Sequence, residues 1–224
     1  MLAAATAAGA QVILPPATGT FNYDVSLNGG VPASHSFACG TVSITGVPLP
    51  VLSAAGGGCT SVLQAILNYS FEIVGATNML VPFSVSSTAM LNATGSAQAG
   101  YSLSVAGQVI GIDNCYFGSL ASCGTKTTMT SMSLMSNQVY AVGMMTAVSN
   151  FLGAGSADAV LDPMFSMLNN DFTFAFSPGI GNGPTASVPE PATLALMLFG
   201  LGFGAAFVGL RRQRESGFAL RGEA

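Results

Sequence analysis

The sequence predicts a mainly β protein: an antiparallel β-sandwich or jelly-roll-like body, followed by a linker and one C-terminal transmembrane helix. Apolar and polar residues alternate with a period of two through most of the chain, and Gly, Pro, Asn or Ser ends each short run. Such alternation is typical of strands with one buried face, and many short strands favour two packed sheets. An uninterrupted apolar stretch near the C-terminus indicates the helix.

Charge is scarce in this chain. Charged residues make up 6% of its 224 residues, against about a quarter in ordinary globular proteins. Between Gln11 and Val188 there is one base, Lys126, and there are six acids. Because binding to a phosphate backbone requires several Lys or Arg residues, we exclude nucleic acid as a partner. The 50% hydrophobic content is enough for a packed core, so we expect an ordered body.

The first ten residues, "MLAAATAAGA", predict the end of a truncated signal peptide. They lack the positive segment and most of the apolar segment of a complete signal. Ala8-Gly9-Ala10 is a small-x-small pattern that suits cleavage before Gln11. The alternative is an Ala-rich leader of a cytoplasmic protein.

The body is predicted at residues 11–178. Its four clearest strands are "FNYDVSLNG", "LNYSFEIVG", "YSLSVAG" and "DFTFAFSPG". One face of these strands carries Phe21, Tyr23, Val25 and Leu27; Leu67, Tyr69, Phe71 and Ile73; Tyr101, Leu103 and Val105; Phe172, Phe174 and Phe176. The segment "SVLQAILN" fits a strand or a helix equally well, because Val62, Leu63, Ile66 and Leu67 also share a helix face.

The body contains four cysteines, Cys39, Cys59, Cys115 and Cys123. An even number in an exported chain favours disulfides. Three pairings are possible, and we favour Cys39–Cys59 and Cys115–Cys123 because they close short loops. Zinc is the weaker interpretation, since C-x-x-C spacing is absent and His35 is the single histidine.

Candidate catalytic groups in the body are few. His35 lies in a predicted strand or strand edge, where an ordinary surface histidine is the simpler interpretation than a catalytic base. Asp158 and Asp162 form a conceivable carboxylate pair for glycoside cleavage, although an Asp-Pro step is more typical of a turn. We expect no enzymatic activity and no cofactor.

Two further segments have weak binding signals. Asp113-Asn114 and Asn169-Asn170-Asp171 contain the oxygen ligands that calcium prefers, but turn-forming Asx residues explain them as well. Gly56-Gly57-Gly58 lacks the lysine of a phosphate-binding loop and predicts a flexible loop.

After a predicted linker at residues 179–187, the apolar run Ala192–Leu210 contains no charge. As a helix it is roughly 28 Å long, close to the thickness of the hydrocarbon core of a bilayer. Arg211, Arg212 and Arg214 follow it and predict a cytoplasmic end, with residues 215–224 as a cytoplasmic tail.

The C-terminal segment 188–214 resembles a PEP-CTERM sorting domain. Val188-Pro189-Glu190-Pro191 precedes the apolar helix, and the arginine cluster follows it. The resemblance implies cleavage in the inner membrane by an exosortase, an integral-membrane protease. Residues 157–181 are also similar to the closing strands of many exported PEP-CTERM proteins. The ten-residue tail is longer than this family usually has.

These observations predict an exported, non-enzymatic surface or extracellular-matrix protein, held in the inner membrane as a precursor. The resemblance further implies a link to exopolysaccharide and biofilm. The alternative is a permanently anchored single-pass membrane protein with a β-rich binding domain. A secreted polysaccharide hydrolase is the third hypothesis.

Overall fold

The computed structural model describes residues 13–22, 25–28, 31–47, 49–58, 60–116, 123–150 and 155–182. The predicted signal remnant, most of the linker, the sorting segment and the tail therefore lie outside the described residues. Within the described ranges, no helix has the length and apolarity needed to cross a membrane.

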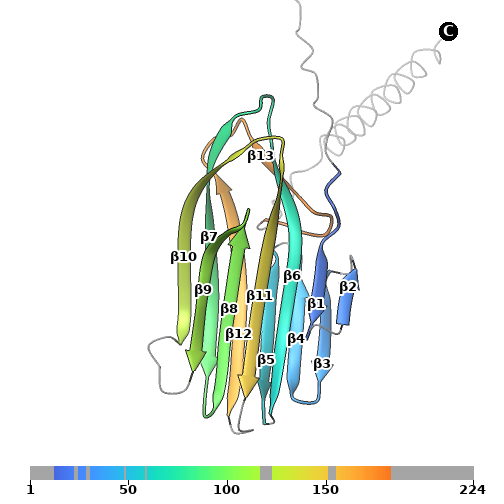
Figure 1. The fold of residues 1–224 in the computed structure, drawn as a ribbon, viewed down its shortest axis with the longest axis vertical. Coiled ribbons are helices and arrows are strands. Elements are labelled where there is room, and N and C mark those ends of the chain that lie inside the picture. Colours follow the sequence, from blue (N-terminus) through green and yellow to red (C-terminus); the bar gives the residue numbers. More distant parts are fainter. Residues whose placement is uncertain are drawn as a thin grey trace, which may run out of the picture. The chain divides into compact units, whose positions relative to one another are not determined.

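In the described part of the chain, thirteen strands form two antiparallel sheets, as the alternation in the sequence predicted (Figure 1). The strands are β1 (Thr18–Phe21), β2 (Val25–Asn28), β3 (Ala33–Phe37), β4 (Gly40–Thr45), β5 (Val51–Gly57), β6 (Ser61–Val74), β7 (Leu80–Ala93), β8 (Ala97–Val105), β9 (Gln108–Tyr116), β10 (Gly124–Met135), β11 (Val139–Asn150), β12 (Ser156–Met167) and β13 (Thr173–Phe176).

Each sheet takes strands from distant parts of the chain. Sheet A has the order β2-β1-β6-β11-β8-β9, with β13 also paired to β6. Sheet B has the order β10-β7-β12-β5-β4-β3. The chain crosses repeatedly from one sheet to the other, so the sheets pack face to face as a sandwich.

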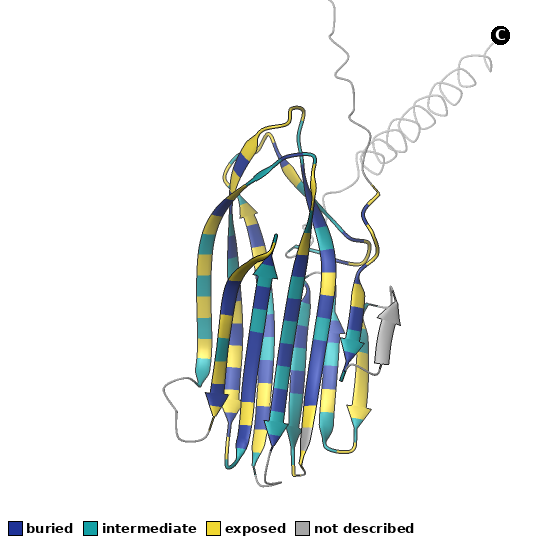
Figure 2. Cartoon of the chain, viewed as in Figure 1, coloured by how far each residue is buried: buried dark blue, intermediate teal, exposed yellow. Residues whose placement is uncertain are grey.

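The core lies between the two inner faces, and buried residues alternate with exposed ones along the strands (Figure 2). Leu67, Tyr69, Phe71 and Ile73 of β6 are all buried, as predicted. Phe71 is at the centre of an aromatic cluster in which its ring centroid lies 5.2 to 6.1 Å from five other rings. This cluster joins strands of both sheets.

The ambiguous segment "SVLQAILN" is the first half of β6. Leu63, Ala65 and Leu67 are buried, whereas Val62 is 56% exposed. A helix would instead bury Val62 with Leu63. The strand is favoured because β11 pairs with β6 over its whole length, from Asn150 opposite Ser61 to Val139 opposite Glu72.

The first predicted strand is in fact a hairpin. β1 ends at Phe21, Asn22 has a left-handed φ of 49°, and β2 returns so that Val25 pairs with Phe21. The period-two pattern continues through the turn and therefore does not mark it. The side chains of Tyr23 and β2 lie outside the described residues.

The prediction of a flexible loop at Gly56–Gly58 is wrong for the first two glycines, which are the last two residues of strand β5. A Cβ atom added at Gly56 would lie 2.7 Å from Leu63 Cδ1 on the opposite sheet. A larger residue at this position would force the Leu63 side chain to shift, so glycine suits the close packing of the sheets. Gly58, with a φ of +78°, then turns the chain.

The body continues past residue 178, into the predicted linker. Ile180 is buried, and the Gly181 N–H donates to the Gly46 carbonyl over 2.6 Å. The Asn182 side chain accepts a hydrogen bond from Phe165 N–H at 2.8 Å and donates to the Phe165 carbonyl at 2.7 Å. Residues 179–182 thus belong to the packed structure, whereas residues 183–187 of the predicted linker lie outside the described residues.

Candidate functional site

A groove lies on the outer face of sheet A. Strand register places the outward-facing side chains in and around it in three rows across β6, β11, β8 and β9. The rows are Val62, Ser149, Gln98 and Tyr116; then Gln64, Ala147, Gly100 and Asn114; then Ile66, Met145, Ser102 and Ile112.

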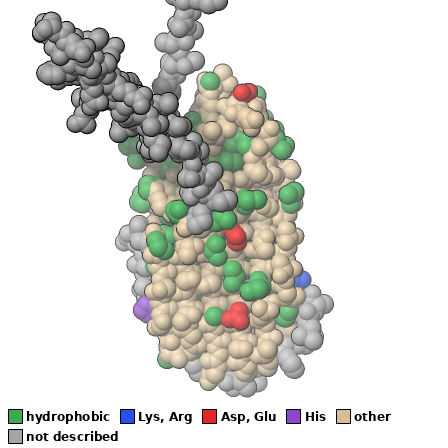
Figure 3. Space-filling view, turned by 180° about the vertical axis from the view of Figure 1, so that it is seen from behind, with side chains coloured by type: hydrophobic (Ala, Val, Ile, Leu, Met, Phe, Trp, Pro, Cys, Tyr) green, Lys and Arg blue, Asp and Glu red, His purple; other side chains and the backbone are tan. Residues whose placement is uncertain are grey.

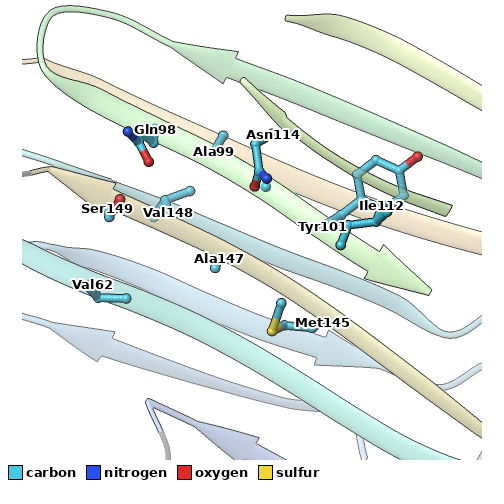
Figure 4. A pocket seen from close by; sticks show the side chains of 11 residues that line it. Val62, Gln98, Ala99, Tyr101, Ile112, Asn114, Met145, Ala147, Val148 and Ser149 are labelled. Atoms are coloured by element: carbon cyan, nitrogen blue, oxygen red, sulfur yellow. The ribbon is translucent and has the colours of Figure 1, made fainter. Parts of the chain in front are cut away.

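The floor of the groove is formed by the two smallest residues of the middle row, Ala147 and Gly100, which are paired between β11 and β8. Larger side chains surround them, and the groove, which is open to solvent, has a volume of about 330 Å³. In Figure 4, Ala147 lies in the open centre between Val62 and Asn114. This volume falls within the range of small-molecule sites, at its lower end.

The shape of the groove also depends on the absence of a side chain at Gly100. An added Cβ atom would collide with the Asn114 side-chain oxygen, so the Asn114 amide occupies the space above the glycine. Gly100 therefore both lowers the floor and lets the amide lean into the groove.

Polar groups line part of this site. The structure shows no intramolecular hydrogen bond to the side chains of Gln98, Asn114 or Ser149, so their donors and acceptors face solvent or a ligand. The Gln64 amide nitrogen donates to Met145 Sδ at 2.7 Å and positions the methionine side chain. Gln64 is 5% exposed, and its side-chain oxygen has no hydrogen-bond partner.

None of the described residues that line the groove is charged. Asp113, next to Asn114 in sequence, alternates to the inner side of β9, where its carboxylate lies 3.7 Å from Lys126 Nζ on β10. The groove therefore presents amide and hydroxyl groups among apolar side chains. It is suited to binding a neutral, partly apolar molecule, and it contains no nucleophile–base pair.

The predicted candidate residues lie elsewhere. His35 is exposed on the edge strand β3, and its ring centroid lies 4.5 Å from that of Phe37 and 6.4 Å from that of Phe21. These contacts are those of a surface histidine packed on aromatic rings, in agreement with the simpler interpretation.

Asp158 and Asp162 both face outward from β12 and are four residues apart. At about 3.3 Å per residue, their backbone positions are separated by roughly 13 Å. The carboxylates of glycosidases are separated by about 5 to 9.5 Å. On the face of sheet B, seen from behind in Figure 3, the acidic side chains likewise lie apart. The geometry does not support a catalytic pair.

The expected turn at Asp162-Pro163 is also wrong, since both residues are inside β12. Pro163 has no N–H to donate, yet it pairs in register with Ser87 of β7. Burial raises the pKa of the Asp162 carboxyl, and one of its oxygens is buried without a hydrogen-bond partner. Burial, and secondarily the Asp162 carboxylate, raises the pKa of the Tyr69 phenol.

We expect Asp162→Asn to flatten the pH dependence of stability. Folding raises the pKa of Asp162, so the folded state binds the proton more tightly than the unfolded state does. The resulting stabilisation is complete at pH values below the ordinary aspartate pKa of about 3.9, and it is lost as the pH rises through the raised pKa. The variant should therefore gain stability relative to the natural chain as pH increases towards 7. Urea unfolding across this pH range tests it, with exposed Asp158→Asn as the control. An unchanged pH profile would contradict the assignment.

The calcium candidates also differ from the predicted loops. Asp113 and Asn114 are consecutive residues of strand β9, so their side chains point to opposite faces. Asn169 does lie in a turn, where its side-chain oxygen accepts a hydrogen bond from Asp171 N–H at 2.9 Å. The residues that the structure describes contain no cluster of three or more His, Cys, Asp or Glu suited to a metal ion.

The predicted disulfide Cys115–Cys123 is confirmed. It joins the end of β9 in sheet A to the residue before β10 in sheet B. Cys39 is also disulfide-bonded, but its predicted partner Cys59 lies outside the described residues, so that pairing stays a prediction. A disulfide removes the Cys115 and Cys123 thiolates as zinc ligands.

Replacing both Cys115 and Cys123 by Ser should lower the free energy of unfolding by roughly 2–3 kcal/mol. The bridge spans a sequence separation of 8 residues, and closing such a loop reduces the entropy of the unfolded chain by about this amount. Thermal unfolding of the variant under oxidising conditions measures the loss. A destabilisation equal to that of a surface Ser131→Ala control would show that the bridge contributes nothing.

Comparison with known proteins identifies the C-terminal segment. Residues 187–213 match the PEP-CTERM protein-sorting motif. The match includes the four residues Val188–Pro191 and the first two arginines of the basic cluster, while Arg214 lies one residue beyond it. The chain thus contains a PEP-CTERM protein-sorting motif near its C-terminus, as its sequence resemblance indicated.

No curated protein matches the chain. Among solved structures, one similar chain is a "Carbohydrate-Binding Module CBM36 in complex with calcium and xylotriose", with 12% sequence identity, covering 71% of this chain and 99% of that one. The TM-score is 0.20, which is too low to support any conclusion about the fold or function of the body.

Proposed function

We propose that this protein is a non-enzymatic component of the bacterial surface or extracellular matrix, released from the inner membrane by an exosortase and associated with exopolysaccharide. The match of residues 187–213 to the sorting motif carries this proposal. The segment follows a disulfide-linked β-sandwich, which suits an oxidising compartment outside the cytoplasm.

In this proposal the sorting segment acts once. Residues 192–210 hold the precursor in the membrane, and Arg211, Arg212 and Arg214 keep its end on the cytoplasmic side. The two prolines around Glu190 hold the backbone extended outside the bilayer, where a protease reaches it. Cleavage there then frees the body.

The body contributes binding rather than catalysis. The outer-face groove on sheet A has unpaired amide and hydroxyl groups but no charged residue. The candidate catalytic residues His35, Asp158 and Asp162 do not form a constellation with one another. A neutral polysaccharide is a partner that such a surface suits.

Expression of the full-length chain in a host with and without its exosortase tests the proposal. With the protease, mass spectrometry should find a C-terminus near Pro189–Pro191, and the body should be recovered from the surface or the exopolysaccharide fraction. Without it, the chain should retain residues 192–210 and remain in the inner membrane. An intact C-terminus in both hosts would overturn the proposal and favour a permanently anchored membrane protein.

A further inference from the structure

We propose that the outer-face groove on sheet A is a binding site for a neutral glycan, with one sugar ring seated over Ala147 beside the Asn114 amide. This inference rests on the proposed association with exopolysaccharide and names the residues responsible for it. The proposed ligand is an uncharged glycan, because the described residues that line the site include no Lys, Arg, Asp or Glu.

The shape of the groove suits a flat ring. Ala147 lies in the middle of four strands, and the Asn114 amide covers its register partner Gly100, so the floor is the small Ala147 side chain with an amide beside it. Val62 and Ile112 rise on opposite sides of this floor and are 56% and 67% exposed. They lie at opposite ends of the groove, on β6 and β9, so each offers apolar contact to the C–H face of a different sugar of a bound chain.

Tyr116 extends this apolar contact along the groove. It pairs with Gln98, lies two residues from Asn114 on the same face of β9, and is 46% exposed. An exposed tyrosine ring provides a large apolar face with a polar hydroxyl at its edge. The next sugar of a chain therefore has an aromatic surface adjacent to the floor.

The amides supply the directional contacts. Gln98 and Asn114 each have an oxygen acceptor and two N–H donors, and neither side chain has an intramolecular hydrogen bond. Sugar hydroxyl groups both donate and accept, so either amide can bind adjacent hydroxyls.

The test is titration of the full-length protein, purified in detergent, with cellohexaose, laminarihexaose, maltohexaose and mannohexaose. Hexagalacturonate and chitosan hexamer serve as anionic and cationic comparisons. We expect at least one neutral hexasaccharide to bind more tightly than both charged ones. Ala147→Leu should weaken this binding at least tenfold by filling the floor, and Asn114→Ala should do so by removing the amide.

Matched controls lie on the other sheet. Ala55→Leu and Asn92→Ala make the same changes at outward-facing positions of sheet B and should leave the affinity within twofold. Circular dichroism should show that all four variants remain folded, since each site faces outward. Binding unaffected by the two groove variants, or a preference for a charged glycan, would overturn the groove assignment. Neither result would change C-terminal processing, so failure of the site is distinguishable from failure of the proposed function.

Discussion

Phe71→Ala should lower the free energy of unfolding by about 3–5 kcal/mol, a large fraction of the stability of a domain of this size. Phe71 is completely buried, and rings from both sheets surround it: Phe83 and Phe165 from sheet B, and Phe174 and Phe176 from β13. Truncation leaves a cavity that these rings cannot fill without moving the sheets. Urea or thermal unfolding of the full-length chain measures the effect.

Two variants make this prediction specific to packing. Phe71→Leu retains much of the volume and should be less destabilising. Tyr116→Ala removes a ring of similar size from the surface, where it is 46% exposed, and should change stability by about 0.5 kcal/mol or less. Equal destabilisation by Phe71→Ala and Tyr116→Ala would show that the aromatic cluster is not the centre of the core.

The inner faces of the strands could be predicted from sequence because burial leaves a period-two pattern. Leu67, Phe71 and Ile73 on β6, and Leu103 and Val105 on β8, are buried as that pattern indicated. The near-neighbour disulfide Cys115–Cys123 was predictable for a similar reason, since short loops close easily. Both features depend on residues close together in the chain.

The groove could not be predicted in this way. Its floor joins Gly100 to Ala147 through a register between β8 and β11 that no local pattern encodes. A small outward-facing residue within a strand is the only signal, and it occurs at many positions. The position of Asp162 was mistaken because Pro163 suggested a turn, whereas the strand continues through the proline without its hydrogen bond.

The hairpin at Asn22 was also missed, although here the alternating pattern itself was correct. Alternation persists from Phe21 to Leu27, so the pattern predicted one strand where the chain reverses. A turn needs only one residue with a suitable backbone, here Asn22 with its positive φ. Alternating patterns therefore locate faces well and strand ends poorly.

Glu190→Ala should abolish release of the body in a host that contains the exosortase, so that the chain accumulates at its full mass of 22.5 kDa less any signal peptide. In the proposed mechanism the glutamate between two prolines is the group the protease recognises on an extended backbone. Pro189→Ala should reduce release as well, because the residue before it is then free to leave the extended conformation. Mass spectrometry of the cell envelope and culture supernatant measures both effects.

Matched substitutions separate recognition from general disruption of the segment. Glu215→Ala removes a carboxylate beyond the arginine cluster, and Pro184→Ala removes a proline from the linker, so both should leave release unchanged. Replacing Arg211, Arg212 and Arg214 by Gln should act differently, by weakening the retention of the C-terminal end on the cytoplasmic side. If Glu190→Ala and Glu215→Ala were released equally well, recognition would have to reside in the apolar helix or the basic cluster. The motif residues would then have no part in selecting the cleavage site.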